Sequence, residues 1–345
     1  MVETDVLVVG AGPIGLEMAA ALKTAGIDHR QVEAGAIGQT VTWYPRQTRY
    51  FSSPERIAIA GVPLPTVGQE KASREEYLAY LRGVVRQFDL QIDTFEPVVA
   101  VERSPGGFGV RTTRKQLRCR RLILAIGDMH KPRMLHIPGE DLPHVSHYFE
   151  EPHPYFGRRL LIVGGKNSAV EAALRCHRAG AEVAISYRRN AFDESSIKYW
   201  LTPEIKALIQ HGQIAFHPET EPVRITEDAV TLQAADRSTS TVPADAVLLL
   251  TGYAQDKTLF KAAGLDLEGV NDAPVLDPQT MEASVPGVYV IGTAAAGTQH
   301  DFKLYIENSH PHVLRVMASL TGAEPTPAVR AVVNTAAETF GLAES

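Results

Sequence analysis

The first apolar stretch of the chain is followed by a glycine-rich turn and then by an Ala-rich amphipathic segment. Residues 5–33 read DVLVVGAGPIGLEMAAALKTAGIDHRQVE, in which the amphipathic segment ends at Gly26 and a second apolar stretch follows. A short apolar run before a glycine turn predicts a buried strand, and the amphipathic segment predicts a helix. The pattern predicts a strand–helix–strand unit with parallel strands.

The glycines of this turn have the spacing GxGxxG. Gly10, Gly12 and Gly15 would supply the tight turn, the close approach of backbone to a pyrophosphate, and the close packing of helix on strand. Glu33 ends the second strand about 20 residues later, where a carboxylate accepts hydrogen bonds from an adenosine ribose. We expect this unit to bind an unphosphorylated adenosine dinucleotide, and a merely structural glycine turn is the alternative.

A second copy of this unit lies at residues 159–189, RLLIVGGKNSAVEAALRCHRAGAEVAISYRR. At an offset of roughly 154 residues the two segments align as an internal repeat. The aligned pairs are Gly10 with Gly164, Gly15 with Ala169, Glu17 with Glu171, Ala25 with Ala179, and Gly26 with Gly180. The chain therefore carries two dinucleotide-binding units.

The two copies differ at their strand ends. The ribose-binding carboxylate of the first copy is replaced by Tyr187, and Arg188 and Arg189 follow at once. Two guanidinium groups favour a 2'-phosphate, and hence NADPH over NADH, although solvated strand-end charges are the alternative. Lys166 stands where the repeat predicts the middle glycine, and its side chain would either crowd a pyrophosphate or offer it a positive charge.

Unequal units suggest a division of labour, in which the first binds FAD and the second NADPH, with hydride passing between them. Residues 121–132 and 246–256 are each an apolar strand that ends in a glycine turn, at Gly127 and Gly252. They resemble the crossings between the domains of thioredoxin-reductase-like flavoproteins. Residues 285–297 resemble the flavin-contacting strand of that superfamily, with Thr293 where an Asp usually binds the ribityl chain.

This architecture predicts an α/β protein of two Rossmann-like, thioredoxin-reductase-like domains. We expect an FAD domain at residues 1–127 and 252–345, interrupted by an NAD(P)H domain at residues 128–251. The expected FAD contacts are Gly10, Gly12, Pro13, Ile14, Gly15, Glu33, Gln39, Val99, Ala125, Gly127, Gly292 and Thr293. The expected NADPH contacts are Gly164, Lys166, Asn167, Ser168, Arg188, Arg189 and Gly252.

Longer motifs resemble the bacillithiol disulfide reductase family of NADPH-dependent flavoproteins over roughly residues 4–320. They are GAGPIGLE, QTVTWYP, YFSSPERIAIAGVPL, SIKYWLTPE and the most specific, IPGEDLPHVSHYFEEPHPYFGRRLLIVGGKNS. Members typically carry a cysteine in the first glycine loop beside the flavin, and here that position is Ile14. Isoleucine cannot attack a disulfide, and the chain has no CxxC. The resemblance therefore implies an NADPH-dependent flavoprotein reductase, and the departure at Ile14 leaves open whether its acceptor has changed.

The composition limits the partners. Hydrophobic residues make up 44% and charged residues 21% of a chain of net charge −6, with acidic and basic positions interleaved. This leaves no basic stripe for nucleic acid and no polybasic membrane patch. No apolar run approaches about 20 residues and no basic leader precedes the first strand, so we expect a cytoplasmic protein. Cys119 and Cys176 are expected to be buried small apolar residues rather than a disulfide framework.

The remaining candidates are histidines and flanking helices. His310 and His312 are poorly spaced for a metal, because residues two apart do not share a helix face. His300 follows Gly297 and would open a helix over residues 301–308, whose positive end would face the flavin as it becomes anionic. An ordinary loop histidine is the alternative. Residues 73–90 predict a helix capped by Ser73 with Glu76 three residues later.

Three functions remain open. The first is an NADPH-dependent reductase of a small acceptor, such as a low-molecular-weight disulfide, a quinone or an electron-carrier protein. The second is a flavin monooxygenase, since TWYP at residues 42–45 loosely resembles that class. The third is a non-catalytic or sensing flavoprotein, which the replacement at Ile14 makes conceivable. The expected partners are the small acceptor and a second copy of the chain; metal, nucleic acid and membrane are not expected.

Overall fold

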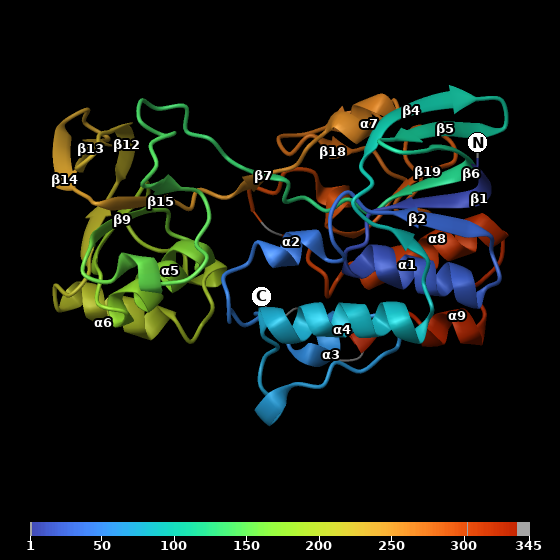
Figure 1. Ribbon diagram of the computed structural model, residues 1–345, viewed down its shortest axis with the longest axis horizontal. Coiled ribbons are helices and arrows are strands. Elements are labelled where there is room, and N and C mark those ends of the chain that lie inside the picture. Colours follow the sequence, from blue (N-terminus) through green and yellow to red (C-terminus); the bar gives the residue numbers. More distant parts are fainter. Residues whose placement is uncertain (1, 302, 337–345) are drawn as a thin grey trace. The chain divides into compact units, whose positions relative to one another are not determined.

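The chain forms two compact units (Figure 1). The computed structural model describes residues 2–301 and 303–336. The first unit comprises residues 2–42, 47–131 and 253–336, and the second comprises residues 43–46 and 132–252.

Three short stretches fall in a different unit from the one we expected. Residues 128–131 belong to the first unit and residue 252 to the second, the reverse of the expected assignment. Residues 43–46 were expected in the first domain, but they belong to the second unit. The ring of Trp43 makes an edge contact with Tyr148, with centroids 6.1 Å apart, and the backbone N–H of Arg46 donates to Glu150 O at 2.9 Å. Tertiary contacts therefore hold this segment, which nothing in its local pattern indicated.

The first unit is built on one mixed sheet in the order β3-β2-β1-β6-β5-β4, with β19 also pairing with β6. Its parallel strands are β1 (Val2–Val9), β2 (His29–Val32), β3 (Ile92–Asp93), β6 (Gln116–Leu124) and β19 (Val288–Val290). β4 (Val98–Ser104) and β5 (Gly107–Thr112) extend it as antiparallel strands. The register pairs Val9 with Leu124, and Leu124 with Val290, so the strands meet at one carboxyl edge.

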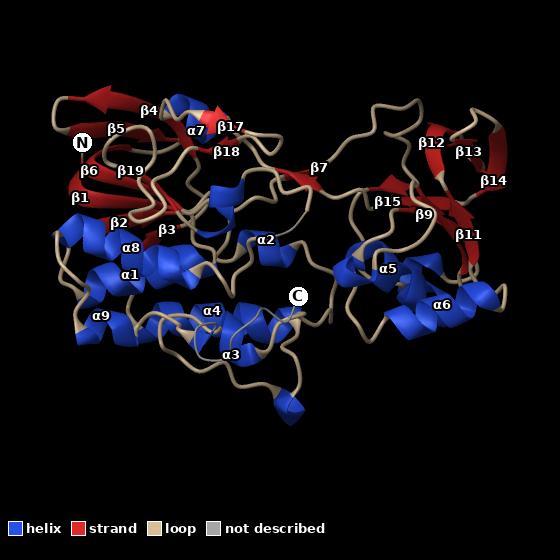
Figure 2. Cartoon of the chain, turned by 180° about the vertical axis from the view of Figure 1, so that it is seen from behind, coloured by secondary structure: helices blue, strands red, loops and turns tan. Residues whose placement is uncertain are grey.

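Helices cover one face of the parallel strands (Figures 1 and 2). The helices of this unit are α1 (Pro13–Thr24), α2 (Gln39–Thr42), α3 (Pro54–Ile57), α4 (Arg74–Gln87), α7 (Thr258–Ala262), α8 (His310–Thr321) and α9 (Pro327–Ala331). Val6 and Val8 of β1 pack on Met18 of α1 and Val316 of α8. The alternate residues of β1 face the other way, toward β4, β5 and α7. The sheet therefore has a buried core on each face.

Short elements complete the first unit. They are the 3₁₀ turns η1 (Val67–Gln69) and η4 (Gly292–Ala296), the strand pair β17 (Leu267–Glu268) and β18 (Ala273–Pro274), and β16 (Tyr253–Ala254), which pairs with β7 (Lys131–Pro132). The predicted capping box is confirmed, because Ser73 and Glu76 exchange both hydrogen bonds at the start of α4. The predicted helix over residues 301–308 is wrong. The described residues there are irregular, residue 302 lies outside them, and α8 begins only at His310.

The second unit has a parallel sheet in the order β11-β10-β9-β15-β8. The strands are β8 (Val145–Ser146), β9 (Arg159–Val163), β10 (Glu182–Tyr187), β11 (Ala215–Pro218) and β15 (Ala246–Leu249). α5 (Asn167–Arg178) and α6 (Thr202–Gln210) cover one face, and the antiparallel strands β12 (Thr220–Ile225), β13 (Ala229–Ala234) and β14 (Thr239–Pro243) cover the other. The 3₁₀ turns are η2 (His153–Tyr155) and η3 (Glu194–Ser196). Both units are Rossmann-like, which confirms the expected α/β class.

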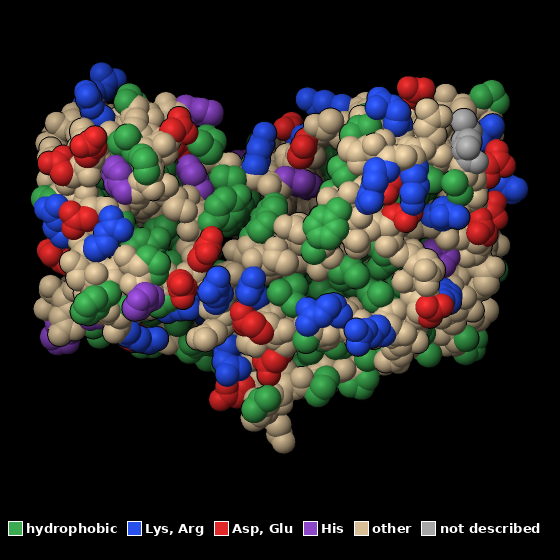
Figure 3. Space-filling model, in the orientation of Figure 1, with side chains coloured by type: hydrophobic (Ala, Val, Ile, Leu, Met, Phe, Trp, Pro, Cys, Tyr) green, Lys and Arg blue, Asp and Glu red, His purple; other side chains and the backbone are tan. Residues whose placement is uncertain are grey.

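The surface carries both signs of charge. On the face drawn in Figure 3, acidic and basic side chains are interspersed over each unit. Among the described residues, no helix combines the length and the apolar character needed to cross a membrane.

Candidate cofactor sites

The glycine loop of the first unit joins β1 to α1. Gly10 has φ +109°, and a Cβ there would lie 2.3 Å from Ala125 O; a Cβ at Gly15 would lie 2.3 Å from Gly10 O. At Gly12, in contrast, no atom lies within 4 Å of the position of a Cβ. This open space adjoins the start of α1, where no side chain caps the helix and Pro13 occupies the first turn. The backbone N–H groups at this helix start, which no side chain caps, fit a pyrophosphate.

The different surroundings of these glycines predict different mutant behaviour. Gly15→Ala is expected to destabilise the protein by about 1–3 kcal/mol, because the methyl group overlaps backbone. Gly12→Ala is expected to leave stability nearly unchanged and to weaken flavin binding, because its methyl group enters the open space. Urea unfolding of the apoprotein and flavin titration measure the two effects. Equal destabilisation by both substitutions would contradict this account.

Backbone hydrogen bonds position the side chain of Glu33, which directly follows β2. Its Oε2 accepts the backbone N–H of Ala11 at 2.6 Å, and its Oε1 accepts that of Gly35 at 2.8 Å. The side chain is buried, with 8% of its surface exposed. The carboxylate is therefore held against the glycine loop, as expected of a ribose-binding group.

Two further expected contacts lie near this end of the sheet. Gln39 Oε1 accepts the N–H of Ala36 at 2.9 Å, which ties α2 to the loop after Glu33. The backbone N–H of Glu96 donates to Glu33 O at 2.8 Å, which holds this segment beside Glu33. Val99 lies three residues after Glu96, in β4. These contacts lie on the side of β1 on which β2 lies, where we expect the adenosine end of a dinucleotide.

Ile14 is buried where the resemblance implied a cysteine. Only 6% of its surface is exposed, and a Cβ on Gly292 would lie 3.3 Å from the Ile14 Cβ. Cys119 lies on β6, about 16 Å along the strand from Leu124 at the glycine-loop edge. Cys119 and Cys176 are buried as expected, with 2% and 0% of their surfaces exposed. Burial raises the pKa of each thiol to about 12, which disfavours the nucleophilic thiolate.

The edge beyond β6 and β19 holds a carboxylate that the sequence patterns did not reveal. Asp128 follows Gly127, and its Oδ2 accepts from Gln299 Nε2 at 3.0 Å. The side chain of Thr293 lies close enough to this carboxylate to favour its ionised form. Burial raises the pKa of Asp128. His300, the neighbour of Gln299, lies in a bend rather than at a helix start.

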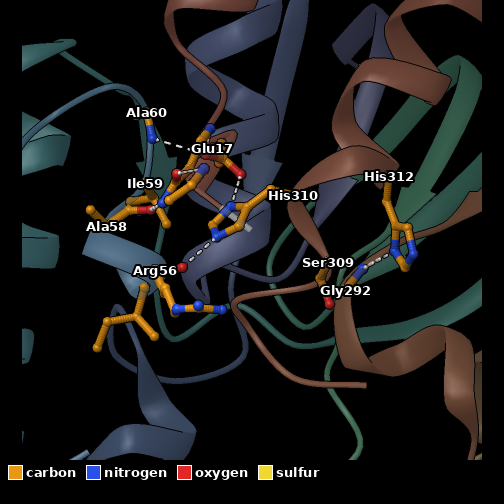
Figure 4. Close-up of polar contacts among 12 residues, drawn as sticks. Glu17, Arg56, Ala58, Ile59, Ala60, Gly292, Ser309, His310 and His312 are labelled. Atoms are coloured by element: carbon orange, nitrogen blue, oxygen red, sulfur yellow. Dashed lines mark hydrogen bonds and ion pairs between the residues drawn. The ribbon is translucent and has the colours of Figure 1, made fainter. Parts of the chain in front are cut away.

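Two histidines of α8 are buried in different roles (Figure 4). His310 Nδ1 lies 2.7 Å from Glu17 Oε2, and its Nε2 lies 3.0 Å from Arg56 O. His312 Nδ1 accepts the backbone N–H of Gly292 at 3.2 Å, and burial lowers the pKa of this histidine to about 4. Within the described residues no group of His, Cys, Asp and Glu has the arrangement of a metal site.

The glycine loop of the second unit repeats the packing of the first. Gly164 has φ +143°, and a Cβ there would lie 2.6 Å from Leu250 O, much as Gly10 approaches Ala125. Lys166 is the N-cap of α5, the position of Gly12 in the repeat, and no side chain caps the helix. Asn167 Oδ1 accepts the N–H of Lys198 at 3.0 Å.

The end of β10 differs from the end of β2, as the sequence indicated. The ring of Tyr187 covers Gly165, where a Cβ would lie 2.4 Å from the ring. Arg188 and Arg189 are exposed, and Arg189 lies 3.9 Å from Asp193. Arg188 therefore is the better candidate to meet a phosphate, because Arg189 already has an acidic neighbour.

Arg133 adds a cation that sequence reasoning missed. Its backbone N–H donates to Gly252 O at 3.0 Å, which places it at the carboxyl end of β15. Burial and the charge of Arg188 lower the pKa of Arg133. Because β15 and β10 flank β9, the two arginines lie on either side of the second glycine loop. Only the strand order could bring residues so distant in sequence together.

Known proteins resemble this chain over most of its length. Bacilliredoxin reductase Bdr from Bacillus subtilis (strain 168) is 34% identical over 325 residues, covering 94% of this chain and 99% of the relative. A ferredoxin–NADP reductase from Paracidovorax citrulli (strain AAC00-1) is 30% identical over 316 residues, covering 85% and 82%. The structure of bacillithiol disulfide reductase Bdr (YpdA) from Staphylococcus aureus superimposes with a TM-score of 0.88 at 33% identity, covering 93% and 99%.

The family follows from the extent of these matches. The sequence profile of the pyridine nucleotide-disulphide oxidoreductases matches residues 7–292, which include both glycine loops and the turn after β19. Two Rossmann-like units, one inserted in the other, carry these loops. The chain therefore belongs to the pyridine nucleotide-disulphide oxidoreductase family, and it is a flavoprotein oxidoreductase that uses a pyridine nucleotide.

Proposed function

We propose that the chain is an NADPH-dependent FAD oxidoreductase, with FAD in the first unit and NADPH in the second. The observation that carries the proposal is the contrast between two similar glycine loops. One is followed by the buried carboxylate of Glu33, and the other by Tyr187, Arg188 and Arg189. A carboxylate accepts from ribose hydroxyl groups and repels a 2'-phosphate, whereas arginines attract it.

The cofactors supply the redox chemistry, since FAD when bound accepts hydride at N5 from NADPH and passes two electrons to an acceptor. The chain's own contribution is to hold the dinucleotides at the helix starts and strand ends. Ile14 places an apolar side chain at the start of α1, so no protein thiol in the described glycine loop relays electrons. The expected acceptor is therefore one that takes electrons directly.

Two acceptor classes follow from the relatives. The first is a low-molecular-weight disulfide, as in NADPH + H⁺ + RSSR giving NADP⁺ and two RSH, because relatives are named bacilliredoxin and bacillithiol disulfide reductases. The second is a small electron-carrier protein, because another relative is named ferredoxin–NADP reductase. Ile14 favours the second class. The buried, unpaired Cys119 and Cys176 fit a reducing cytoplasm.

An acceptor screen tests the proposal. Released cofactor should be FAD by mass spectrometry, and anaerobic NADPH should bleach it. NADPH oxidation is then followed with disulfides, ferredoxin, quinones and oxygen in turn. Release of FMN alone, or no bleaching by either nicotinamide coenzyme, would reject the proposal. Stoichiometric oxygen use with an oxygenated product would instead indicate a monooxygenase.

Arg188 is expected to set the coenzyme preference. Arg188→Ala should lower kcat/KM for NADPH by about tenfold and leave the value for NADH nearly unchanged, because a charge-assisted hydrogen bond at an exposed site is lost. Arg189→Ala should have a smaller effect, because Asp193 already neutralises part of its charge. Arg224→Ala, an exposed arginine on β12, is the matched control. Equal wild-type values for NADPH and NADH would refute the assignment.

A further inference from the structure

Asp128 lies at the edge of the first unit where a dinucleotide would continue past the glycine loop. Glu33 assigns the adenosine to the β2 side of β1, and the open space at Gly12 assigns the pyrophosphate to the end of β1. β6 and β19 lie on the other side of β1, in the order β2-β1-β6 with β19 on β6. Neighbouring strands are about 4.8 Å apart, so the next part of an extended cofactor reaches the ends of β6 and β19.

The chain carries the Asp128 carboxylate to this edge through glycine turns. Gly127, with φ +73°, follows β6, and Gly292, with φ +70°, follows β19. A Cβ on Gly127 would lie 3.9 Å from Thr293 Oγ1, so the two turns face each other. Asp128 and Thr293 are the side chains that come next, one on each turn, and Thr293 is close enough to favour the ionised form of Asp128.

The partners of Asp128 do not neutralise it. Gln299 Nε2, which donates to it, and the nearby Thr293 hydroxyl are both uncharged. The charge of Lys257 favours the ionised form of Asp128, but its ammonium donates to other groups. They are Gln255 Oε1 at 2.9 Å, the backbone O of Asn271 at 2.9 Å and that of Asp272 at 3.0 Å, which use its three protons. Asp128 forms no ion pair with any described residue, although it is only 8% exposed.

Burying such a carboxylate lowers the stability of the fold unless a bound ligand donates a hydrogen bond to it. An ionised carboxylate has about four acceptor positions, and the side chain of Gln299 occupies one of them. A buried charge without a counter-ion is unfavourable and is concentrated at functional sites. A pyrophosphate would be repelled by it, whereas a hydroxyl group would donate to it. Gln299 cannot turn away, because its Oε1 also accepts the N–H groups of Lys303 and Leu304.

We infer that Asp128, opposite Thr293, binds the ribityl chain of the flavin by accepting a hydrogen bond from one of its hydroxyl groups. The inference rests on the proposed function, because it requires FAD in the first unit. Gln299 acts as a positioning residue that holds the carboxylate in place. The carboxylate thus comes from the turn after β6, and not from the turn after β19.

Cofactor analogues test this contact without relying on activity. The apoprotein is titrated with FAD and with analogues that lack the ribityl 2'-, 3'- or 4'-hydroxyl. Asp128→Ala is expected to weaken FAD binding about tenfold to hundredfold, the loss of one charge-assisted hydrogen bond. For one deoxy analogue, wild type and variant should bind equally. Asp266→Ala, an exposed acid of the same unit, should bind FAD like wild type.

The outcomes separate the inference from the proposed function. If wild type binds no FAD, the proposed function falls. If wild type binds FAD and Asp128→Ala binds it equally well, or loses the same factor with every analogue, only the inference falls. If the variant does not fold, the wild-type titrations decide. One deoxy analogue should then bind at least about tenfold more weakly than FAD, and equal binding of all analogues would overturn the inference.

Discussion

Replacing Ile14 by cysteine is expected to raise disulfide-dependent NADPH oxidation by roughly two orders of magnitude or more, since removal of a nucleophile in well-studied enzymes costs even more. The position is the second residue of α1, where the helix start lowers the pKa of a thiol. The introduced thiolate would attack a disulfide sulfur, release one thiol and form a mixed disulfide, which two electrons from NADPH then reduce. Wild type lacks this step.

The matched control is Ile14→Ser, because a serine side chain has nearly the same shape as a cysteine side chain but carries a hydroxyl group instead of a thiol. Both substitutions shorten a buried side chain that packs against Gly292, so both should lose a similar amount of stability. Steady-state rates with bacillithiol disulfide and with ferredoxin are measured for all three proteins. If wild type already reduces the disulfide as fast as Ile14→Cys, electrons pass without a thiol. If neither protein reduces it, the acceptor belongs to another class.

Removing the Glu17 carboxylate is expected to destabilise the first unit by about 3–5 kcal/mol, the usual cost of leaving one partner of a buried ion pair alone. Glu17 and His310 are 0% and 1% exposed at their side chains (Figure 4). Glu17 Oε1 also accepts the N–H groups of Ala60 at 3.1 Å and Asn334 at 2.9 Å. Glu17→Ala therefore leaves three donors unsatisfied, on three different segments of the chain.

The pH dependence gives this prediction a second readout. Burial lowers the pKa of His310, but Glu17, with smaller contributions from the carbonyl of Arg56 and from Glu307, raises it overall. His312, which burial keeps neutral, is the other titratable neighbour. A raised folded-state pKa contributes stability that is complete below the unfolded value of about 6.5 and is lost as pH rises through the folded value.

Urea unfolding from pH 5.5 to 9 measures both effects. Wild type should lose stability relative to His310→Gln as the pH rises, and Glu17→Ala should no longer show this difference. Glu55→Ala removes an exposed carboxylate from α3 and serves as the control. A loss in Glu17→Ala no larger than that in Glu55→Ala would show that the pair contributes little.

Several local features were predictable because short-range physics specifies them. The capping box of Ser73 and Glu76 joins residues three apart, and the structure confirms it. The strand–helix–strand pattern of residues 5–33 likewise depends on neighbouring residues. Gly10 is required by its positive φ and by the approach of Ala125 O, a constraint that the GxGxxG spacing records. Both Rossmann-like units followed from such patterns.

The prediction of a helix over residues 301–308 failed for a tertiary reason. The side chain of Gln299 accepts the backbone N–H groups of Lys303 and Leu304, and the side chain of Asn308 accepts that of Tyr305. These side-chain acceptors replace the helical hydrogen bonds. The helix starts instead at His310, whose ring is held by Glu17.

The sequence alone determined the two dinucleotide loops, the contrast between Glu33 and the arginine pair, and the absence of a thiol at Ile14. Each of these features depends on a few consecutive residues, because the steric limits at glycine positions and the charge at a strand end act locally. Only the tertiary structure joined Asp128 to Gln299, His310 to Glu17, and Arg133 to the strand end at Arg188. These partners are far apart along the chain, and strand order, which no local pattern encodes, decides which residues meet.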